Sequence, residues 1–340
     1  MESASKQMLI LKAIVDSYIA TGEPVASKTI CDMLDYKVSS ATVRNYMAQL
    51  MKLGYIIQPH TSAGRIPSDK GYLEYIGVFV GDEPTQDIKD NIDNALLECD
   101  NEPDSVLKAI VDLLSRMLNG YAFATTPDSK DARIYAVRFV KIGRYTAMAV
   151  LVTTSGVVKT GLFRCEYVIT DEVINIFEKL IGDRFTGVMI QEVNSAFLQS
   201  TAVSMGELGM LMSNVLWTVG RLCGSAEEIT LFSSENAART FKNGDYESAQ
   251  RLGTLLSDKK RLTRLAGEYD NGVYFGGLTD ITELEGFALI SQRYTVSGTS
   301  TGVLSVICST RTDYLSAVPA VKYAAQEAGK MIKSIVGGDE

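Results

Sequence analysis

The segment from Ser39 to Lys52 combines residue types suited to contacting DNA. In a helix, with about 100° per residue, one side of this segment is apolar and holds Val43, Tyr46, Met47 and Leu50. The opposite side is small and polar and holds Ala41, Arg44, Asn45, Ala48 and Lys52. Arginine and asparagine form paired hydrogen bonds with guanine and adenine edges in the major groove. The pattern indicates a recognition helix, although an ordinary helix with a solvated outer face has the same periodicity.

Hydroxyl side chains stand at the start of this helix. Ser39, Ser40 and Thr42 can contact phosphates there, together with the exposed backbone N–H groups of a helix N-terminus. Lys52 adds a cation near the other end. These residues are the candidate backbone contacts, and Arg44 and Asn45 are the candidate base contacts.

A second polar segment, Gln58-Pro-His-Thr-Ser-Ala-Gly-Arg65, reads as a turn between two short β runs. Such a turn suits a loop that lies on the sugar-phosphate backbone or in a minor groove. Its candidate contacts are His60, Thr61, Ser62 and Arg65. His60 is the only histidine of the chain, and a turn residue with local hydrogen bonds is the alternative. Catalysis at His60 is improbable, because a lone histidine supplies neither a catalytic partner nor a metal-ligand set.

The elements that must position these residues are three helices and a hairpin. Helical spacing predicts helices over 6–21, 27–34 and 39–53, the first ended by Gly22 and the third by Gly54. A β hairpin follows over 55–67, and a fourth helix over 69–80. This order within fewer than 70 residues is typical of a winged helix-turn-helix. We therefore expect residues 1–80 to form the DNA-binding domain.

The remaining residues predict an α+β fold. Strand-like runs occur at 134–142, 146–153 and 157–163, and again at 273–275, 286–294 and 303–308, around a mostly helical block. We expect residues 81–185 and 265–340 to form one domain and 186–264 to be inserted into it. The helix predicted over 205–223 carries the sole Trp217 and many Met and Leu residues. A small insertion cannot bury that much apolar surface alone, so this block is the predicted dimer surface.

Charge is unevenly distributed between the two parts of the chain. The net charge is −8, but residues 1–72 carry eight Lys and Arg against six Asp and Glu. A mildly basic segment on an acidic body is compatible with DNA binding. Few phosphates can be neutralised, so non-specific affinity is expected to be low.

Motifs of catalysis and of cofactor binding are absent from the sequence. It contains no phosphate-binding loop, no nucleophile elbow and no His-Glu-x-x-His helix. The five cysteines are scattered, which favours reduced and mostly buried thiols over a disulfide framework or a zinc site. Arg311–Asp313 suits either a ligand in a cleft or a structural ion pair. We expect no enzymatic activity, no cofactor, no metal, no membrane span and a cytoplasmic location.

Several segments together resemble one bacterial family. Gly22-Glu-Pro-Val25, Ser39-Ser-Ala-Thr-Val-Arg-Asn45, Gln58-Pro-His-Thr-Ser-Ala-Gly-Arg-Ile-Pro67 and Asp69-Lys-Gly-Tyr72 resemble the heat-inducible transcription repressors of the HrcA family. The resemblance continues more weakly at Gly156-Val-Val158 and at Ser309-Thr-Arg-Thr-Asp-Tyr314. It implies a winged helix, a GAF-like domain and a dimerising domain inserted into it.

The same resemblance implies a function. It predicts repression of chaperone operons by a homodimer bound to an inverted repeat in double-stranded DNA, the CIRCE element, with the chaperonin GroEL as a further partner. Two alternatives stay open. One is a winged-helix regulator whose GAF-like domain senses a small molecule. The other is an enzyme or signalling protein whose helix-turn-helix serves protein contacts.

Overall fold

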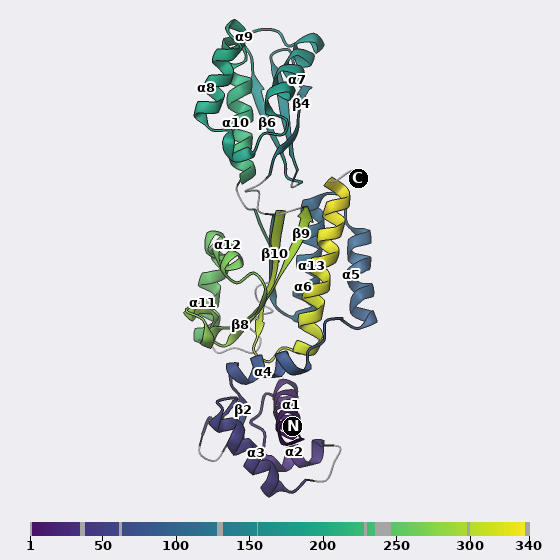
Figure 1. Ribbon diagram of the computed structural model, residues 1–340, viewed down its shortest axis with the longest axis vertical. Helices are drawn as coiled ribbons and strands as arrows, with labels where there is room; N and C mark the ends of the chain where they lie inside the picture. Colours follow the sequence, from purple (N-terminus) through teal and green to yellow (C-terminus); the bar gives the residue numbers. More distant parts are fainter. Residues whose placement is uncertain are drawn as a thin grey trace.

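The structure is a computed structural model, and it describes residues 2–34, 38–60, 63–127, 132–154, 156–227, 230–234, 246–297 and 300–336. Three bodies follow one another along the long axis (Figure 1). We call them the head (2–80), the central body (82–127 and 230–336) and the outer body (132–227). None of the helices in these ranges combines the length and apolar character that a membrane span requires.

The head consists of four helices and one hairpin. The helices are α1 (Glu2–Thr21), α2 (Ser27–Met33), α3 (Ser40–Lys52) and α4 (Asp69–Phe79), and the hairpin pairs β1 (Ile56–Ile57) with β2 (Ile66–Pro67). Gly22 and Gly54 follow α1 and α3 with φ of 74° and 77°, values that favour glycine at helix ends. The predicted helices and hairpin of this segment are therefore confirmed, and α1 begins earlier than expected.

The central body is a five-stranded antiparallel sheet between two layers of helices. The strands are β3 (Tyr121–Thr125), β7 (Leu231–Ser233), β8 (Gly272–Phe275), β9 (Phe287–Ser297) and β10 (Ser300–Ser309), in the order β7-β3-β10-β9-β8. One face is covered by α5 (Gln86–Glu98), α6 (Pro103–Leu118) and α13 (Tyr314–Val336), the other by α11 (Tyr246–Ser257) and α12 (Lys259–Glu268) (Figure 1). Every residue of β3 is buried, as expected for a strand covered on both faces.

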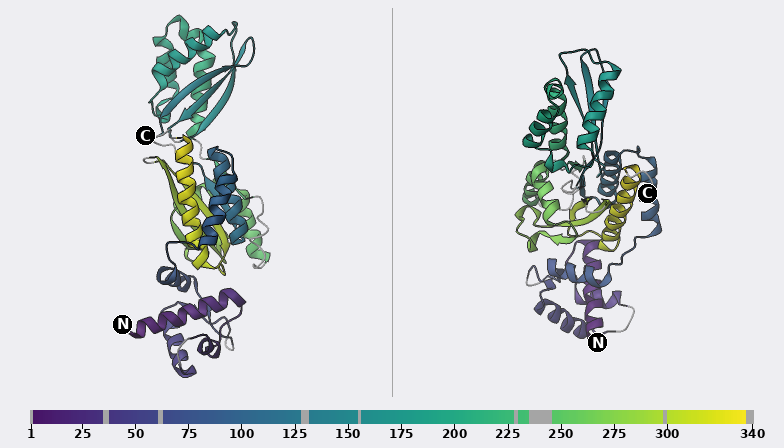
Figure 2. Two further views of the ribbon diagram at one scale, coloured as in Figure 1. Left: turned by 90° about the vertical axis from the view of Figure 1, so that its right-hand side faces the viewer. Right: turned by 45° about the horizontal axis from the view of Figure 1, so that its top comes forward.

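The outer body is a three-stranded sheet with helices on one face. Its strands are β4 (Ile134–Lys141), β5 (Thr146–Thr153) and β6 (Val158–Arg164), and its helices are α7 (Asp171–Phe185), α8 (Ser195–Ser204), α9 (Glu207–Leu211) and α10 (Ser213–Glu227). Phe139, Phe163 and Phe177 meet with ring centroids 5.8–6.0 Å apart, which joins α7 to the sheet. Figure 2 shows the helices on one side of this sheet and the other side open.

The division between these bodies differs from the one expected. We predicted that 186–264 forms the insertion, with residues up to 185 in the surrounding domain. In the structure the inserted body already begins with β4, because β4–β6 and α7 share one core with α10. The helices α11 and α12 instead pack on the central sheet. Apolar spacing identifies the buried side of each element, but it does not identify the partner that covers it.

The chain leaves and re-enters the central sheet at one place. The backbone N–H of Thr126, after β3, donates to the carbonyl oxygen of Thr230, before β7, over 2.9 Å.

All five cysteines are free, and Cys165, Cys223 and Cys308 are buried, as predicted.

Aromatic stacking joins the head to the central body. Tyr72 of α4 lies parallel to Phe275 of β8, with ring centroids 5.4 Å apart and 12° between the planes. Tyr314 of α13 contacts both rings, and all three side chains are buried. The guanidinium of Arg311 also lies against Gly22, where an added Cβ would be 1.9 Å from Nη1. The head is thus packed onto the central body through α4 and the end of α1.

Candidate nucleic-acid interface

The helix α3 has the two faces that the sequence predicts. Val43, Met47 and Leu50 are buried in the core of the head, and Tyr46 packs against it half-buried. The opposite side is exposed and comprises Ala41, Thr42, Arg44, Asn45, Ala48, Gln49, Met51 and Lys52. The side chains of Asn45 and Lys52 make no hydrogen bond or ion pair with any described residue. Their polar groups are therefore available to a ligand.

The hydroxyl groups at the start of α3 have local partners. Oγ of Ser39 accepts from the backbone N–H of Thr42 over 3.1 Å and so caps the helix. The same atom lies 2.8 Å from Oγ1 of Thr42. These contacts fix the first turn, and they leave its exposed side chains at the surface of the head.

A residue that sequence reasoning missed lies beside Arg44. Nε of Arg44 donates to Oγ of Ser27 over 3.3 Å, and Ser27 Oγ lies 3.1 Å from Oγ of Ser40. Ser27 is the first residue of α2, 17 positions before Arg44. Helical periodicity relates residues within one helix only, so no signal in the sequence connected Ser27 with the exposed face of α3.

The backbone of the hairpin is joined to the segment before α2. Val25 and Arg65 exchange two backbone hydrogen bonds of 2.8 and 2.9 Å. Gly64 allows this approach, because an added Cβ would lie 2.6 Å from the carbonyl oxygen of Val25. The hairpin is therefore held beside α2 and α3 by main-chain contacts.

The two described candidate side chains of the hairpin differ in exposure, since Arg65 is half-buried and His60 is exposed. Nη1 of Arg65 donates to the carbonyl oxygens of Ala63 and Gly64 over 3.3 and 3.4 Å, so this half-buried side chain folds back on its own loop. Its Nε is buried without a partner in the described part of the chain. His60 is exposed, and its carbonyl oxygen accepts from Ala63 N over 2.9 Å. The other two predicted contacts, Thr61 and Ser62, lie outside the described residues.

A groove separates α3 from the hairpin. It encloses about 610 Å³ and is lined by Val25, Ala26, Ser27, Arg44, Met47, Ala48, Met51, Ala63, Gly64 and Arg65. Arg44 stands on one wall and Arg65 on the other. Two arginines that line a shared groove suit an anionic chain such as a nucleic-acid backbone, because arginine pairs well with phosphate oxygens.

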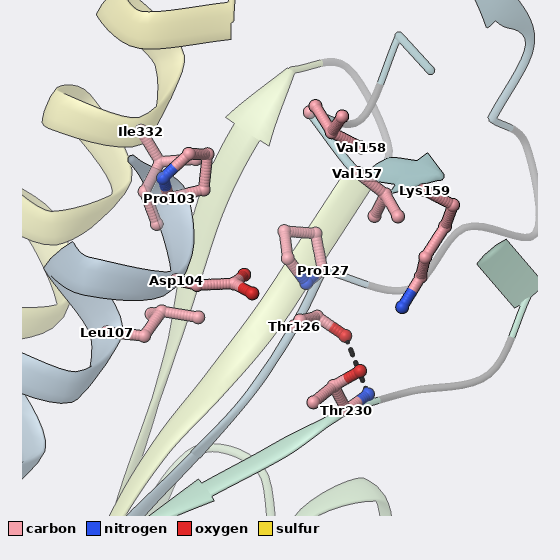
Figure 3. A pocket seen from close by; sticks show the side chains of 11 residues that line it. Pro103, Asp104, Leu107, Thr126, Pro127, Val157, Val158, Lys159, Thr230 and Ile332 are labelled. Atoms are coloured by element: carbon pink, nitrogen blue, oxygen red, sulfur yellow. Dashed lines mark hydrogen bonds between the residues drawn. The ribbon is translucent and has the colours of Figure 1, made fainter. Parts of the chain in front are cut away.

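A small cavity lies where the outer body meets the central body. Pro103, Asp104 and Leu107 of α6 line one side, and Val157 and Lys159 line the other (Figure 3). Oγ1 of Thr126 accepts from the backbone N–H of Thr230 over 2.9 Å at its edge. The cavity measures about 30 Å³, the space of one or two water molecules and far below that of a metabolite.

The Arg311–Asp313 segment serves the fold. Oδ1 of Asp313 accepts from the N–H of Leu315 over 3.1 Å, and Oδ2 accepts from the hydroxyl of Ser316 over 2.7 Å. Asp313 thereby satisfies groups in the first turn of α13. Arg311 lies against Gly22. The two alternatives that the sequence left open, a ligand in a cleft and a structural ion pair, therefore do not describe this segment. Within the described ranges, no three His, Cys, Asp or Glu side chains are grouped as a metal site requires.

The chain is similar to known transcription repressors over nearly its whole length. It is 29% identical over 331 residues to the heat-inducible transcription repressor HrcA of Lachnoclostridium phytofermentans, covering 95% of both chains. It is 28% identical over 338 residues to the HrcA repressor of Acetivibrio thermocellus, covering 97% of this chain and 96% of the relative. A solved structure, the crystal structure of a hypothetical protein, matches with a TM-score of 0.62 and 26% identity over 97% of both chains.

These relatives define the class of protein as transcription repressors, which are regulators and not enzymes. The family described as "HrcA protein C terminal domain" matches residues 104–318. The chain belongs to the HrcA family.

Proposed function

We propose that this protein is a DNA-binding repressor of heat-shock chaperone operons, with the head acting as a winged helix-turn-helix. The observation that carries the proposal is the exposed polar face of α3 beside the groove shared by Arg44 and Arg65. In this arrangement α3 enters the major groove, with Arg44 and Asn45 at base edges. The hairpin then lies on the adjacent backbone with His60, Thr61, Ser62 and Arg65.

Phosphate contacts come from the two ends of α3 in this proposal. Ser39, Ser40 and Thr42 lie at its N-terminus, where backbone N–H groups attract anions, and Lys52 is the last residue of the helix. Because the head carries few cations, binding depends more on base contacts than on charge. Affinity for the operator therefore falls less steeply with salt than for a strongly basic DNA-binding protein.

The operator is an inverted repeat of the CIRCE type, and the protein binds it as a two-fold dimer. One short helix on a weakly charged head gives little specific affinity alone, and two heads joined by one body add their contacts. A two-fold axis in the protein then requires inverted half-sites in the DNA.

The outer body has the surface that a dimer needs. On the open side of its sheet, three rows run across the three strands, and each row holds one residue from each strand. Seven of these nine residues are apolar: Ala136, Arg138, Val140, Met148, Val150, Val152, Val158, Thr160 and Leu162. Leu162 is 61% exposed, and the core helices α7 and α10 pack on the other face. A second copy of the chain, related by the two-fold axis, removes this apolar surface from water.

The predicted helical surface is the second candidate for the dimer contact. Met210 of α9 is 82% exposed and Trp217 of α10 is 68% exposed. Both belong to the outer body, so we propose this body as the dimerising domain whichever of the two surfaces makes the contact.

Regulation by the chaperonin GroEL follows from the same exposed apolar surface. A monomer leaves the sheet face and the α9–α10 surface in water, and apolar surface of this kind is what a chaperonin binds. Unfolded proteins compete for the chaperonin during heat stress, less repressor reaches the dimeric state, and chaperone operons are transcribed.

The central body enters this proposal as the GAF-like domain, and the water-sized cavity at its edge gives no support to a small-molecule signal.

One footprinting experiment tests the core of the proposal. The full-length protein is titrated onto DNA from the promoter of a chaperone operon that carries a CIRCE repeat, and onto the same DNA with one half-site scrambled. Protection of both half-sites on the intact repeat, lost on the scrambled DNA, supports a dimeric operator-binding repressor. Equal protection of both DNAs contradicts it.

A further inference from the structure

The hydroxyl of Ser27 contacts the arginine that we assign to base recognition. Ser27 begins α2 and is half-buried, at the edge of the groove between α3 and the hairpin. Its Oγ accepts from Nε of Arg44 over 3.3 Å and lies 3.1 Å from Oγ of Ser40. A serine hydroxyl has one proton and two acceptor sites, so it satisfies both contacts at once.

The position of this hydrogen bond on the guanidinium determines what the arginine can still do. Arginine carries five N–H donors, and only the one on Nε is used by Ser27. The donors on Nη1 and Nη2 remain for a ligand. A guanine edge offers two acceptors, O6 and N7, which match two such donors. With Nε held by Ser27, Nη1 and Nη2 are the groups of Arg44 that are left to bind a ligand.

A restrained arginine also binds with a smaller loss of entropy. The long side chain of a free arginine loses rotamer freedom when a ligand fixes it in one conformation. A hydrogen bond formed before DNA binds removes part of this entropy cost. It also excludes side-chain orientations of the arginine that would fit other base edges.

We propose that Ser27 is a positioning residue for base recognition: its hydroxyl holds Nε of Arg44, so that Nη1 and Nη2 are directed at a single base edge. The inference rests on the proposed DNA-binding function. It adds a residue from outside the recognition helix, and it assigns Ser40 as the neighbour that fixes the Ser27 hydroxyl.

The test uses the full-length protein and a set of fluorescent duplexes. One duplex carries the CIRCE inverted repeat, and each of the others carries the same symmetric base-pair change in both half-sites. Arg44→Ala first identifies the position at which discrimination depends on Arg44. Ser27→Ala should then reduce discrimination at that same position about three- to tenfold, the effect of one hydrogen bond, and leave the other positions unchanged. Ser27→Thr keeps the hydroxyl and should restore discrimination.

Two controls separate positioning from a merely structural role. Thr29→Ala removes an exposed hydroxyl from the same helix, one without a hydrogen bond in the described structure, and should change nothing. Adding Ser27→Ala to Arg44→Ala should cause no further loss of discrimination. The inference is overturned if Ser27→Ala weakens all duplexes equally, leaves discrimination intact, or acts fully in the Arg44→Ala background. If the wild type fails to prefer the repeat over all other duplexes, the proposed function itself is wrong.

Discussion

The backbone N–H of Gly277 donates a hydrogen bond to Oδ2 of Asp69 over 3.1 Å, across 208 positions of sequence. Asp69 opens α4 in the head, and Gly277 follows β8 in the central body. An added Cβ at this place would lie 2.5 Å from the same carboxylate oxygen, so a larger residue would displace the side chain of Asp69. Together with the stacking of Tyr72 on Phe275, this bond sets how the head sits on the body. In a dimer, the same contacts set the distance between the two heads.

The junction should respond to pH through Asp69. Partial burial raises the pKa of Asp69, the N–H of Gly277 opposes that rise, and the nearby charge of Glu285 adds to it. A carboxyl group whose pKa is raised in the folded state contributes stability at low pH, and this contribution is lost as the pH rises through the folded pKa. The free energy of unfolding of the wild type, minus that of Asp69→Asn, should therefore fall as the pH rises above about 4, the ordinary pKa of an aspartate side chain.

Asp82 provides a control of opposite sign for that measurement. Its hydrogen bond and charge contact with Lys322 lower the pKa of Asp82. The difference between the wild type and Asp82→Asn should accordingly rise with pH below the ordinary carboxyl pKa of about 4 and stay level above it. Urea unfolding at several pH values measures both differences. Parallel slopes for the two variants would contradict the assignment of Asp69.

Two buried tyrosines of α4 should respond in opposite ways to loss of the hydroxyl. The hydroxyl of Tyr72 is buried with no partner among the described residues, whereas that of Tyr75 donates to Oδ1 of Asp16 over 2.7 Å. Tyr72→Phe should leave the free energy of unfolding equal or raise it by up to about 1 kcal/mol, and Tyr75→Phe should lower it by about 1–2 kcal/mol. Thermal unfolding of both variants checks this. A large loss for Tyr72→Phe would show that its hydroxyl has a partner in solution.

Arg44 and Lys52 should differ in how they contribute to operator binding. Arg44→Ala should cost about 1–3 kcal/mol of binding free energy and relax specificity at one position in each half-site. Lys52→Ala should weaken binding to all duplexes about equally and reduce the slope of log affinity against log salt by about one. Fluorescence anisotropy at several salt concentrations distinguishes the two. A uniform loss with Arg44→Ala would make this residue a phosphate contact.

Substitutions in the hairpin should affect operator affinity and the melting temperature independently. The double variant His60→Ala/Arg65→Ala should weaken operator binding and leave the melting temperature nearly unchanged, because the hairpin is held by the Val25–Arg65 backbone bonds. Gly64→Ala should lower the melting temperature, since its Cβ would displace the carbonyl of Val25. Differential scanning calorimetry with binding assays checks both. A large drop in melting temperature for the double variant would show that these side chains are structural.

The open sheet face should control oligomeric state. Leu162→Arg places a charge among apolar residues of β4–β6 and should weaken the dimer more than tenfold, about 1.4 kcal/mol or more. Leu97→Arg alters a leucine of the central body that is 82% exposed and should leave the dimer intact. Light scattering at micromolar concentration measures the outcome.

The α9–α10 surface is tested in the same experiment with Trp217→Ala. Loss of the dimer with this variant alone would move the contact from the sheet to the helices. A wild type that is a monomer, or dimers that resist both substitutions in the outer body, would contradict the assignment of this body.

Local signals in the sequence were enough to predict the elements of the head and the buried side of α3. Val43, Met47 and Leu50 repeat with the period of a helix, Ser39 is a favoured cap, and Gly22 and Gly54 end helices. These signals act over a few residues, so they can be identified from the chain alone.

The pairing of strands and the contacts between distant side chains could be known only from the folded molecule. Pairing of β3 with β10, stacking of Tyr72 on Phe275, and the contact of Ser27 with Arg44 join residues whose separation no periodicity describes. The boundary of the outer body was wrong in the sequence-based division for the same reason. The apolar side of α11 or of α7 must pack against a sheet. The local pattern of each helix fits the central sheet and the sheet of the outer body equally well. Which sheet each helix packs on depends on how the whole chain fills its hydrophobic cores, and this is a property of the packed molecule.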